Sequence, residues 1–295
     1  MSQATLQATV ATPSSIRPLT QDELNFYHEH GYVIVRGLFD SEEMDLVQSV
    51  CQSDPNIESA LKPVIDDQGR KWAAAVWGGL NDSLVSVVTR TARMVEVAES
   101  IIGQQPCYFM FSKIVQKPAH DDSVVYWHQG FPAWYSDGCT FPDMFASCSI
   151  AVNKNTKDNG CLQVIAKSHR LGRITHVAEG NAEKVRCDPH RITRALEHLE
   201  VVDCEMEPGD VVFFHGNTIH GSRENSTDGV RILMHCHYNA MVNGPSEAKP
   251  ESHPCVPIKK VPDSAIKDGL YTSGFESNRQ EWDWYNKEPE NYAKQ

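Results

Sequence analysis

The chain has 295 residues, of which 27 are Lys or Arg and 39 are Asp or Glu, giving a formal net charge of −12 at pH 7. This balance disfavours partners such as nucleic acids or anionic membranes, because both require a basic protein surface. The length allows one large domain with a sizeable core, and no apolar run is long enough to cross a bilayer.

The cysteine content indicates a reducing compartment. The nine cysteines contain no CxxC pair and no spacing typical of a zinc site, and their number is odd. We therefore predict a cytoplasmic protein. Residues 1–16 carry no charge and lack the cationic and apolar regions of a signal peptide, so we expect a disordered tail over residues 1–18.

The first folded elements alternate between helix and strand. Thr20, followed by Glu23, forms a capping box for a short helix that ends near Gly31. The β-branched residues 32–36 then predict a strand, and Asp40 opens an amphipathic helix that continues to about Ser53. A second helical recurrence of apolar residues occupies residues 83–103.

Most of the remaining chain is predicted to be β structure. Short apolar runs separated by turns rich in Gly, Pro, Asp and Asn favour strands at 107–116, 124–129, 145–153, 162–165, 211–214 and 231–239. Many short strands with a few supporting helices predict an α+β, mostly β fold built on a β-sandwich or jelly roll. Residues 171–200 are expected to form an insertion between strands, and residues from 244 onwards a surface extension.

Three elements carry residues suited to chemistry. The first is His128-Gln129-Gly130 at a strand end, where a period of two would direct residues 128 and 130 to the same side. The second is a turn and strand from Pro208 that leads to His220 and Ser222. The third is Arg231, at the start of the next predicted strand. Two histidines and an arginine suit a metal and an anion.

In these motifs the chain resembles the phytanoyl-CoA hydroxylase-like branch of the Fe(II)/2-oxoglutarate-dependent oxygenases, a branch that includes ectoine hydroxylase. The resemblance extends from about Leu19 to Asn239. It rests on the order and spacing of these segments: Gly31 to Leu38, Trp127-His128-Gln129, Asn159 to Leu162 with Ser168-His169-Arg170, Pro208-Gly209-Asp210, His220-Gly221-Ser222, and Arg231.

The resemblance implies a fold and a set of site residues. The fold would be a double-stranded β-helix, or jelly roll, that holds iron at one mouth. His128 and His220 would be the iron ligands. Arg231 and Ser222 would bind the distal carboxylate of 2-oxoglutarate, since a guanidinium fork suits bidentate carboxylate binding. Gln116, on the strand before His128, would touch the same cosubstrate.

Gly130 is the departure from the family pattern. Hydroxylases of the family have Asp at this position, whereas a branch of iron halogenases has Gly or Ala. Exchanging a carboxylate for chloride leaves the charge of the site unchanged, and glycine leaves room for the halide. The resemblance thus implies a halogenase that uses Fe(II), 2-oxoglutarate, chloride and O2, and chlorinates an unactivated aliphatic C–H bond through an Fe(IV)-oxo species and radical rebound.

Gly130 leaves other interpretations open. The chain is alternatively a hydroxylase of the same family, either native, with a carboxylate such as Asp121, Asp122 or Asp137 replacing the missing one, or as an Asp-to-Gly variant at Gly130. A further alternative is a non-catalytic relative that binds a small molecule. Retention of His128, His220, Ser222 and Arg231 argues against this last alternative.

The expected substrate is a small-molecule metabolite, either free or attached to a carrier protein, and nothing in the sequence marks a carrier interface. Candidate substrate residues are Trp72, Trp77, Phe131, Trp134, His235 and His237, each of which is also consistent with ordinary core packing. His235 and His237 share strand parity with Arg231, which favours an inward orientation. We expect the oxygenase domain at residues 19–243 and a C-terminal extension packed on it at residues 244–295.

Overall fold

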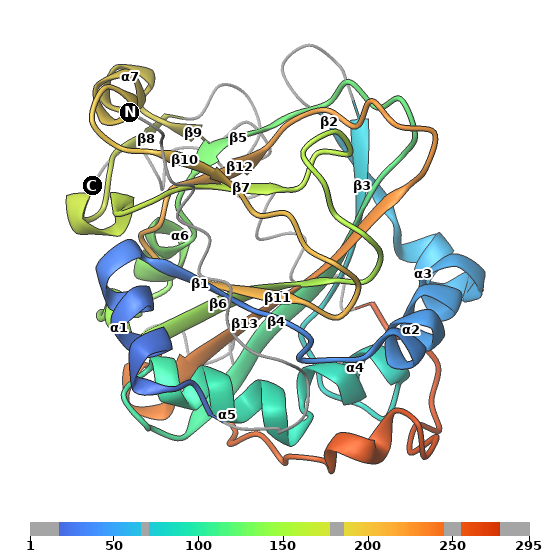
Figure 1. Cartoon of the computed structure of the whole chain (residues 1–295). Helices are drawn as coiled ribbons and strands as arrows, with labels where there is room; N and C mark the ends of the chain where they lie inside the picture. The colour runs from blue at the N-terminus through green and yellow to red at the C-terminus, as the bar shows by residue number, and fades with distance from the viewer. Residues whose placement is uncertain (1–17, 66–70, 178–185, 245–254, 278–295) are drawn as a thin grey trace.

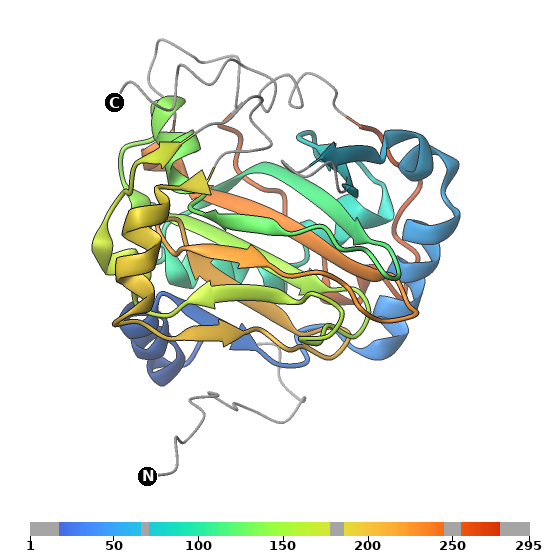
Figure 2. The ribbon, with the colours of Figure 1, turned by 90° about the horizontal axis from the view of Figure 1, so that it is seen from above.

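A computed structural model describes residues 18–65, 71–177, 186–244 and 255–277, and all structural statements concern these residues. Two antiparallel sheets face each other, and helices cover the outer face of the larger sheet (Figure 1). Seen from above, the strands of the two sheets run across the molecule in layers (Figure 2). Two facing antiparallel sheets with few helices are the architecture of a jelly roll, which confirms the predicted fold class.

The N-terminal elements follow from their capping signals. Helix α1 (Gln21–His30) begins with the reciprocal hydrogen bonds of a capping box between Thr20 and Glu23. It ends at Gly31, whose φ of 80° lies in the left-handed region that favours glycine. Strand β1 (Tyr32–Val35) and helix α2 (Ser41–Ser53) follow, and a second capping box opens α2. These predictions are confirmed.

The larger sheet has the order β1-β11-β6-β13-β4-β3-β2, and the smaller sheet has the order β10-β7-β12-β5. The strands of the larger sheet beyond β1 are β2 (Lys62–Ile65), β3 (Lys71–Trp77), β4 (Cys107–Lys117), β6 (Phe145–Ala151), β11 (Val211–His215) and β13 (Arg231–Ala240). Those of the smaller sheet are β5 (Val125–His128), β7 (Leu162–Ile165), β10 (Val201–Asp203) and β12 (His220–Ser222).

The other elements are short. Helices α3 (Pro55–Ala60), α4 (Leu84–Thr89), α5 (Ala92–Ile101), α6 (Phe131–Ser136) and α7 (Pro189–Leu196) connect or cover strands, and β8 (His176–Val177) pairs with β9 (Arg186–Cys187). Elements α7, β8 and β9 lie in the insertion predicted at residues 171–200, although residues 178–185 are outside the described part. Strands β2, β3, β10 and β12 were not predicted as strands.

The helix predicted over residues 83–103 is two helices. Helix α4 ends at Thr89, and α5 begins after Thr91, which forms an isolated bridge with Val261. The hydroxyl groups of Thr89 and Thr91 donate to the carbonyl groups of Ser86 and Val88, so local side-chain bonds replace the helical ladder at the break.

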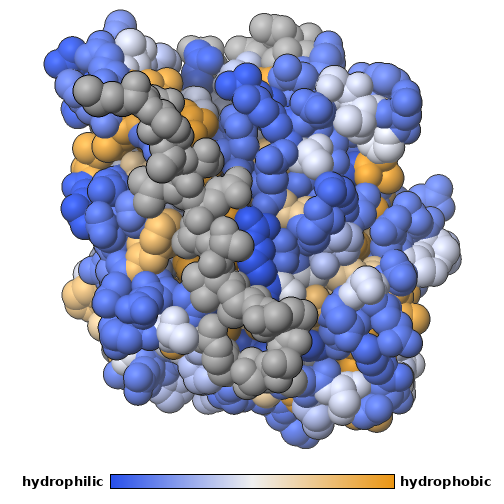
Figure 3. Space-filling view, viewed as in Figure 1, coloured by the Kyte–Doolittle hydropathy of each residue, from blue (hydrophilic) through white to orange (hydrophobic). Residues whose placement is uncertain are grey.

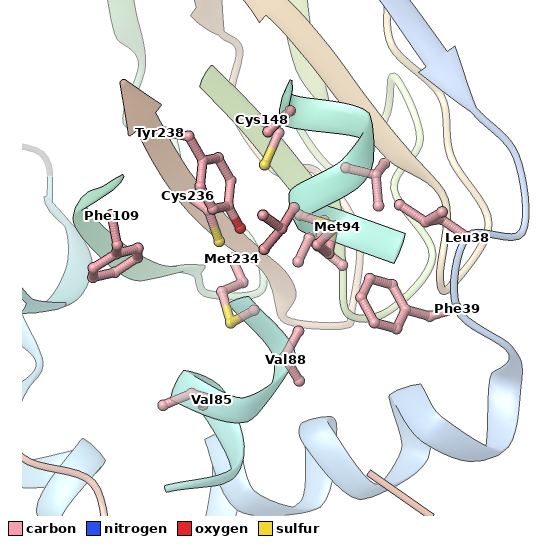
Figure 4. Packing of buried hydrophobic residues seen from close by; sticks show 14 of the residues in the cluster. Leu38, Phe39, Val85, Val88, Met94, Phe109, Cys148, Met234, Cys236 and Tyr238 are labelled. Atoms are coloured by element: carbon pink, nitrogen blue, oxygen red, sulfur yellow. The ribbon is translucent and has the colours of Figure 1, made fainter. Parts of the chain in front are cut away.

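The main apolar core lies between the larger sheet and the helices. Val85, Val88 and Met94 from α4 and α5 pack against Met234 and Tyr238 of β13 (Figure 4). A second apolar cluster lies between the two sheets and includes Leu233 of β13 with residues of β1, β7 and β11. Alternate residues of β13 thus face the helices and the interior of the jelly roll, as strand geometry requires.

The predicted terminal segments lie largely outside the described residues. This applies to residues 1–17 of the expected tail and to residues 245–254 and 278–295 of the expected extension. The described residues 255–277 pack on the helical side, where Phe275 contacts Trp77 at 5.5 Å between ring centres. The domain boundaries remain a prediction.

One face of the molecule is mostly hydrophilic (Figure 3). Among the described helices, none combines the length and apolar character needed to cross a membrane.

Candidate iron and 2-oxoglutarate site

The two predicted metal-ligating histidines lie side by side. His128 ends β5 and His220 begins β12, and the two residues are direct cross-strand partners in the smaller sheet. Their ring centres are 4.1 Å apart. Adjacent strands therefore bring together two residues that are far apart in the sequence, at a separation suited to neighbouring ligands of one metal ion.

Each histidine ring is oriented by its own backbone. His128 Nδ1 donates to the carbonyl oxygen of Tyr126 at 2.8 Å, and His220 Nδ1 donates to that of Thr218 at 2.9 Å. This pattern directs the Nε2 lone pair of each ring toward a metal. Burial lowers the pKa of His220 to about 4. Burial also lowers the pKa of His128 well below its ordinary value, and the neighbouring His220 lowers it further. Both rings stay neutral, as metal ligation requires.

Gln129 and His176 hold the segment after His128, and neither was predicted as a site residue. The Gln129 amide nitrogen donates to the carbonyl oxygens of Gly172 and Asn217, and its amide oxygen accepts from the backbone of Ile174. The backbone N–H of Gln129 donates to His176 Nε2 at 2.9 Å. Gln129 could have been suspected from the sequence because it lies between His128 and Gly130. Nothing in the sequence indicated a role for His176.

Gly130 is not required by the backbone. It has φ −77° and ψ −38°, which any L-residue adopts, and it precedes helix α6. Strand β5 ends at His128, so the predicted period-two alternation does not extend to residue 130. A Cβ atom placed on Gly130 would meet only Trp134 Nε1, at 3.6 Å. A larger residue would therefore fit here, and the missing side chain calls for a chemical explanation.

No carboxylate replaces the missing one among the described residues. Asp121 accepts a hydrogen bond from the backbone of Ser123, Asp122 is exposed, and Asp137 lies at the C-terminal end of α6. Within the described ranges, no group of three or more His, Cys, Asp or Glu residues could hold a metal ion. This part of the protein thus offers two imidazoles without a carboxylate partner.

Arg231 is the predicted carboxylate-binding residue, and its surroundings suit an anion. It begins β13, its side chain is buried, and its Nε and Nη1 groups have no hydrogen-bond partner among the described residues. Burial lowers the pKa of Arg231 to about 10, while Cys161 and Asp121 act in the opposite direction. A guanidinium group buried with unused N–H groups is costly unless a ligand completes it. A carboxylate would do so.

Lys117 completes the surroundings of Arg231, its cross-strand partner on β4. Lys117 Nζ donates to the Ser222 hydroxyl at 3.2 Å and to the carbonyl oxygens of Ser123 and Arg223. It thereby connects the larger sheet to β12 and links the predicted Ser222 to the cross-strand partner of Arg231. Nothing in the sequence singled out Lys117, because a lysine near a strand end is usually solvated.

The prediction for Gln116 is wrong. Its side chain donates to the carbonyl oxygen of Cys51 at 3.1 Å, in helix α2. Its cross-strand partner Ile232 belongs to the core beneath the helices, so Gln116 points away from Arg231. Successive residues of a strand face opposite sides of the sheet, so it is the next residue, Lys117, that lies on the same face as Arg231.

The predicted aromatic residues divide between two faces. Trp77 is wrong as a substrate residue, because it is 1% exposed and packs in the core on the helical side. Trp72 packs against Ala74 and Val115 on the opposite face of the larger sheet. Phe131 and Trp134 lie in a buried aromatic cluster close to the site. Substrate contact by Trp72, Phe131 and Trp134 remains a prediction.

His235 and His237 face the interior, as strand parity predicted. Their Nδ1 atoms are hydrogen-bonded to Ser149 at 2.7 Å and to Ser147 at 3.0 Å, both on β6. Burial lowers the pKa of each imidazole well below its ordinary value. Their contact with a substrate is untested.

These residues fit the cofactors implied by the sequence. His128 and His220 suit Fe(II), which accepts imidazole ligands. The unused N–H groups of Arg231 suit one carboxylate of 2-oxoglutarate, and the Ser222 hydroxyl is bonded to Lys117, the cross-strand partner of Arg231. The arrangement can thus bind a metal and a dicarboxylate between the two sheets. Chloride stays a prediction.

Comparison with known proteins supports this assignment. The family model described as phytanoyl-CoA dioxygenase (PhyH) matches residues 27–233. An ectoine dioxygenase of Bordetella bronchiseptica is 26% identical over 240 residues, which is 76% of this chain and 77% of that protein. An L-proline trans-4-hydroxylase of Streptomyces griseoviridis is 28% identical over 60% of this chain and 73% of its own length.

Solved structures share the fold. The EctD protein of S. alaskensis with bound Fe superposes with a TM-score of 0.68 at 20% identity, covering 88% of this chain and 93% of that one. Its complex with 2-oxoglutarate and 5-hydroxyectoine has a TM-score of 0.65 at 21% identity, over 93% and 90% of the two chains. Because these structures are only 20% and 21% identical to this chain in sequence, the likeness shows that the chain has the same jelly-roll fold and nothing further.

Proposed function

Because this chain belongs to the phytanoyl-CoA dioxygenase family, we propose that it is an Fe(II)/2-oxoglutarate-dependent oxygenase that oxidises an aliphatic C–H bond of a small molecule. The observation that carries the proposal is the pairing of His128 with His220 in the same jelly roll as the incompletely bonded Arg231. Family membership supports the same cofactors.

The protein's own residues bind and orient the reactants. His128 and His220 would hold the iron through Nε2, with their rings fixed by the carbonyl groups of Tyr126 and Thr218. Arg231 and Ser222 would hold 2-oxoglutarate, with Lys117 positioning the serine hydroxyl. Together, iron, 2-oxoglutarate and O2 supply the oxidant that removes hydrogen from an unactivated C–H bond.

Hydroxylation is the first outcome that we propose. The relatives reported above are named as a dioxygenase and a hydroxylase, which supports the transfer of oxygen to substrate. In a hydroxylase without a protein carboxylate, water would take the metal position that His128 and His220 leave beside Gly130. The substrate would then gain one hydroxyl group.

Halogenation is a second candidate, and one specific observation favours it. Gly130 offers no carboxylate at a position where the backbone would accept a larger residue, and no described carboxylate takes its place. Chloride has the same charge as the absent carboxylate. The Trp134 indole nitrogen lies 3.6 Å from the point that a Cβ atom on Gly130 would occupy, so the added atom would meet this neighbour at ordinary contact distance. Halogenation also requires that the substrate carbon lie nearer to the halide than to oxygen.

One experiment tests the proposed function and separates its two outcomes. The purified protein is incubated with Fe(II), 2-oxoglutarate, O2 and a small-molecule metabolite extract, in chloride and separately in bromide, and products are identified by mass spectrometry. Products that gain only oxygen in both salts establish hydroxylation. Products that gain chlorine in one and bromine in the other establish halogenation. Absence of both, together with no release of succinate, contradicts the proposed function.

A Gly130→Asp variant identifies the role of the missing side chain. If the chain is a halogenase, restoring the carboxylate should exclude halide and reduce halogenated product. If the chain is a hydroxylase that lost its aspartate, the variant should bind Fe(II) more tightly and form more hydroxylated product. Gly130→Ala is the matched control, because it adds a Cβ without a metal ligand.

A further inference from the structure

One imidazole nitrogen on the interior face of the larger sheet has no hydrogen-bond partner among the described residues. His237 of β13 is 8% exposed, and its Nε2 atom is buried and unbonded within this part of the chain. Its Nδ1 atom lies 3.0 Å from the Ser147 hydroxyl oxygen on β6, which holds the ring in one orientation. A buried polar atom without a partner is costly, so the Nε2 atom indicates a ligand that completes it. The proposed function above gives His237 no role.

Cross-strand pairing places His237 in a row of side chains that begins at the metal site. Phe214 on β11 pairs with Ser147 on β6, and Ser147 pairs with His237 on β13. Directly paired residues point to the same face of a sheet, and Phe214 packs between the two sheets, so all three face the interior. The ring centres of Phe214 and His220 are 4.7 Å apart. Neighbouring strands are about 4.8 Å apart, so His237 lies roughly 10 Å across the sheet from the residue that contacts His220.

Trp134 connects His237 to Gly130 by a second, independent set of contacts. The ring centres of Trp134 and His237 are 5.8 Å apart. The indole nitrogen of the same residue lies 3.6 Å from the point that a Cβ atom on Gly130 would occupy. His237 and the position of the missing carboxylate therefore adjoin one indole ring. Both the sheet pairing and this helix contact place His237 next to the candidate iron site.

The rings around His237 favour an uncharged ligand group. Phe111 stacks on the imidazole with ring centres 4.3 Å apart and planes at 21°, and the ring centre of Phe145 is 6.2 Å away. Transfer of a charged group from water to such an aromatic surface costs far more than transfer of a neutral one. A neutral imidazole donates or accepts at Nε2 according to its tautomer, whereas a hydroxyl group does both. A hydroxyl group therefore satisfies His237 in either tautomer.

We propose that His237 determines substrate specificity by forming a hydrogen bond, through Nε2, with an uncharged hydroxyl group of the substrate. Ser147 would fix the imidazole, and Phe111, Phe145 and Trp134 would contact the apolar carbons beside the hydroxyl. This bond would anchor one end of a small molecule while another of its carbons lies near the metal. The inference rests on the proposed function and specifies its substrate class as an uncharged compound with a hydroxyl group on an apolar skeleton.

Two probes of similar size test the proposal, since benzyl alcohol carries a hydroxyl group and toluene lacks it. The full-length protein is labelled with ¹⁵N at histidine and loaded with 2-oxoglutarate and Zn(II), a diamagnetic substitute for Fe(II). Long-range ¹H–¹⁵N spectra then report the chemical shift of each imidazole nitrogen during a titration. We expect benzyl alcohol to shift the Nε2 resonance of His237 saturably. It should bind about fivefold or more tightly than toluene, because only the alcohol completes the hydrogen bond.

Variants assign the preference for the alcohol to His237. In His237→Leu the two probes should bind within twofold of each other by calorimetry, and the 2-oxoglutarate dissociation constant should stay within twofold of the wild type. His237→Gln should restore part of the preference, because an amide also donates and accepts. His198→Leu is the matched control, since the His198 side chain is 72% exposed, and it should keep the full preference. Circular dichroism confirms folding, and the wild-type resonance with His237→Gln provides the test if His237→Leu is unstable.

The outcomes are distinguishable. A His237 Nε2 resonance that benzyl alcohol does not shift overturns the proposal, as does a preference for the alcohol that His237→Leu retains. Benzoate that shifts the same resonance at a lower concentration than benzyl alcohol overturns the uncharged class. Failure of Zn(II) and 2-oxoglutarate to bind the wild type contradicts the proposed function instead, and the same titrations of the metal-free protein still test the role of His237.

Discussion

Replacing Arg231 should weaken 2-oxoglutarate binding without destabilising the protein. An ordinary buried ion-pair arginine is destabilising to remove, because its partner is left uncompensated. Arg231 differs, since two of its N–H groups are unused by the described residues. Arg231→Met removes a guanidinium that burial disfavours, and it keeps an apolar side chain in the same space.

The expected magnitudes follow from these contacts. Two hydrogen bonds to a charged group contribute about 1.5 kcal/mol each at the low end, so their loss costs about 3 kcal/mol, or roughly 100-fold in Kd. The free energy of unfolding of the ligand-free variant should stay within about 1 kcal/mol of the wild type, because the lost desolvation cost offsets the lost packing.

Two assays measure these effects. Calorimetric titration of the Mn(II)-loaded protein gives the Kd of 2-oxoglutarate, and urea unfolding of the metal-free protein gives its stability. Gln116→Met is the matched control, because Gln116 lies on the neighbouring strand and faces helix α2. A variant that keeps 2-oxoglutarate affinity within about twofold, or that loses about 3 kcal/mol or more of stability, would refute the role assigned to Arg231.

Three other predictions test the surrounding residues. His220→Ala should abolish the charge-transfer absorbance of the Fe(II) and 2-oxoglutarate complex, whereas His215→Ala should retain it, since His215 binds Asp143 instead; equal spectra would exclude His220 as a ligand. Gln129→Leu should lower metal affinity roughly 10- to 100-fold by freeing the loop behind His128, and unchanged affinity in a metal titration would dismiss this positioning role. The pKa of His176 is lowered to about 4, so the unfolded chain binds more protons below pH 6.5 and stability should fall as the pH decreases toward 4, with His176 contributing up to about 3 kcal/mol. His176→Asn should flatten this dependence in urea unfolding, and a slope equal to that of the wild type would contradict it.

The local elements were predictable where capping and alternation both applied. Thr20 with Glu23 marked the start of α1, and the alternation of β13 placed Arg231, His235 and His237 on one face. The resemblance placed Gln116 at the cosubstrate, and sequence alone does not define which side of an isolated strand faces the interior. Cross-strand pairing with Ile232 resolves the parity.

The candidate iron ligands His128 and His220 were predicted by resemblance, whereas the residues that hold the segments around them could be identified only from the fold. Lys117 reaches Ser222 from another sheet, and His176 reaches Gln129 from the insertion. Both contacts join residues distant in sequence through side chains that no local pattern pairs. Trp77 was wrongly assigned to the substrate site because the sequence does not show which face of β3 its side chain occupies. In the fold, Trp77 packs in the core on the helical side.

We propose that this protein binds iron with two histidine ligands and without a protein carboxylate. A crystal structure of the Fe(II) and 2-oxoglutarate complex, grown anaerobically in bromide and measured with anomalous scattering at the iron and bromine edges, would test this metal coordination. We predict iron bound by His128 and His220, 2-oxoglutarate against Arg231, and a bromide ion or water beside Gly130. Iron bound by an Asp or Glu side chain, or located away from these two histidines, would contradict this coordination.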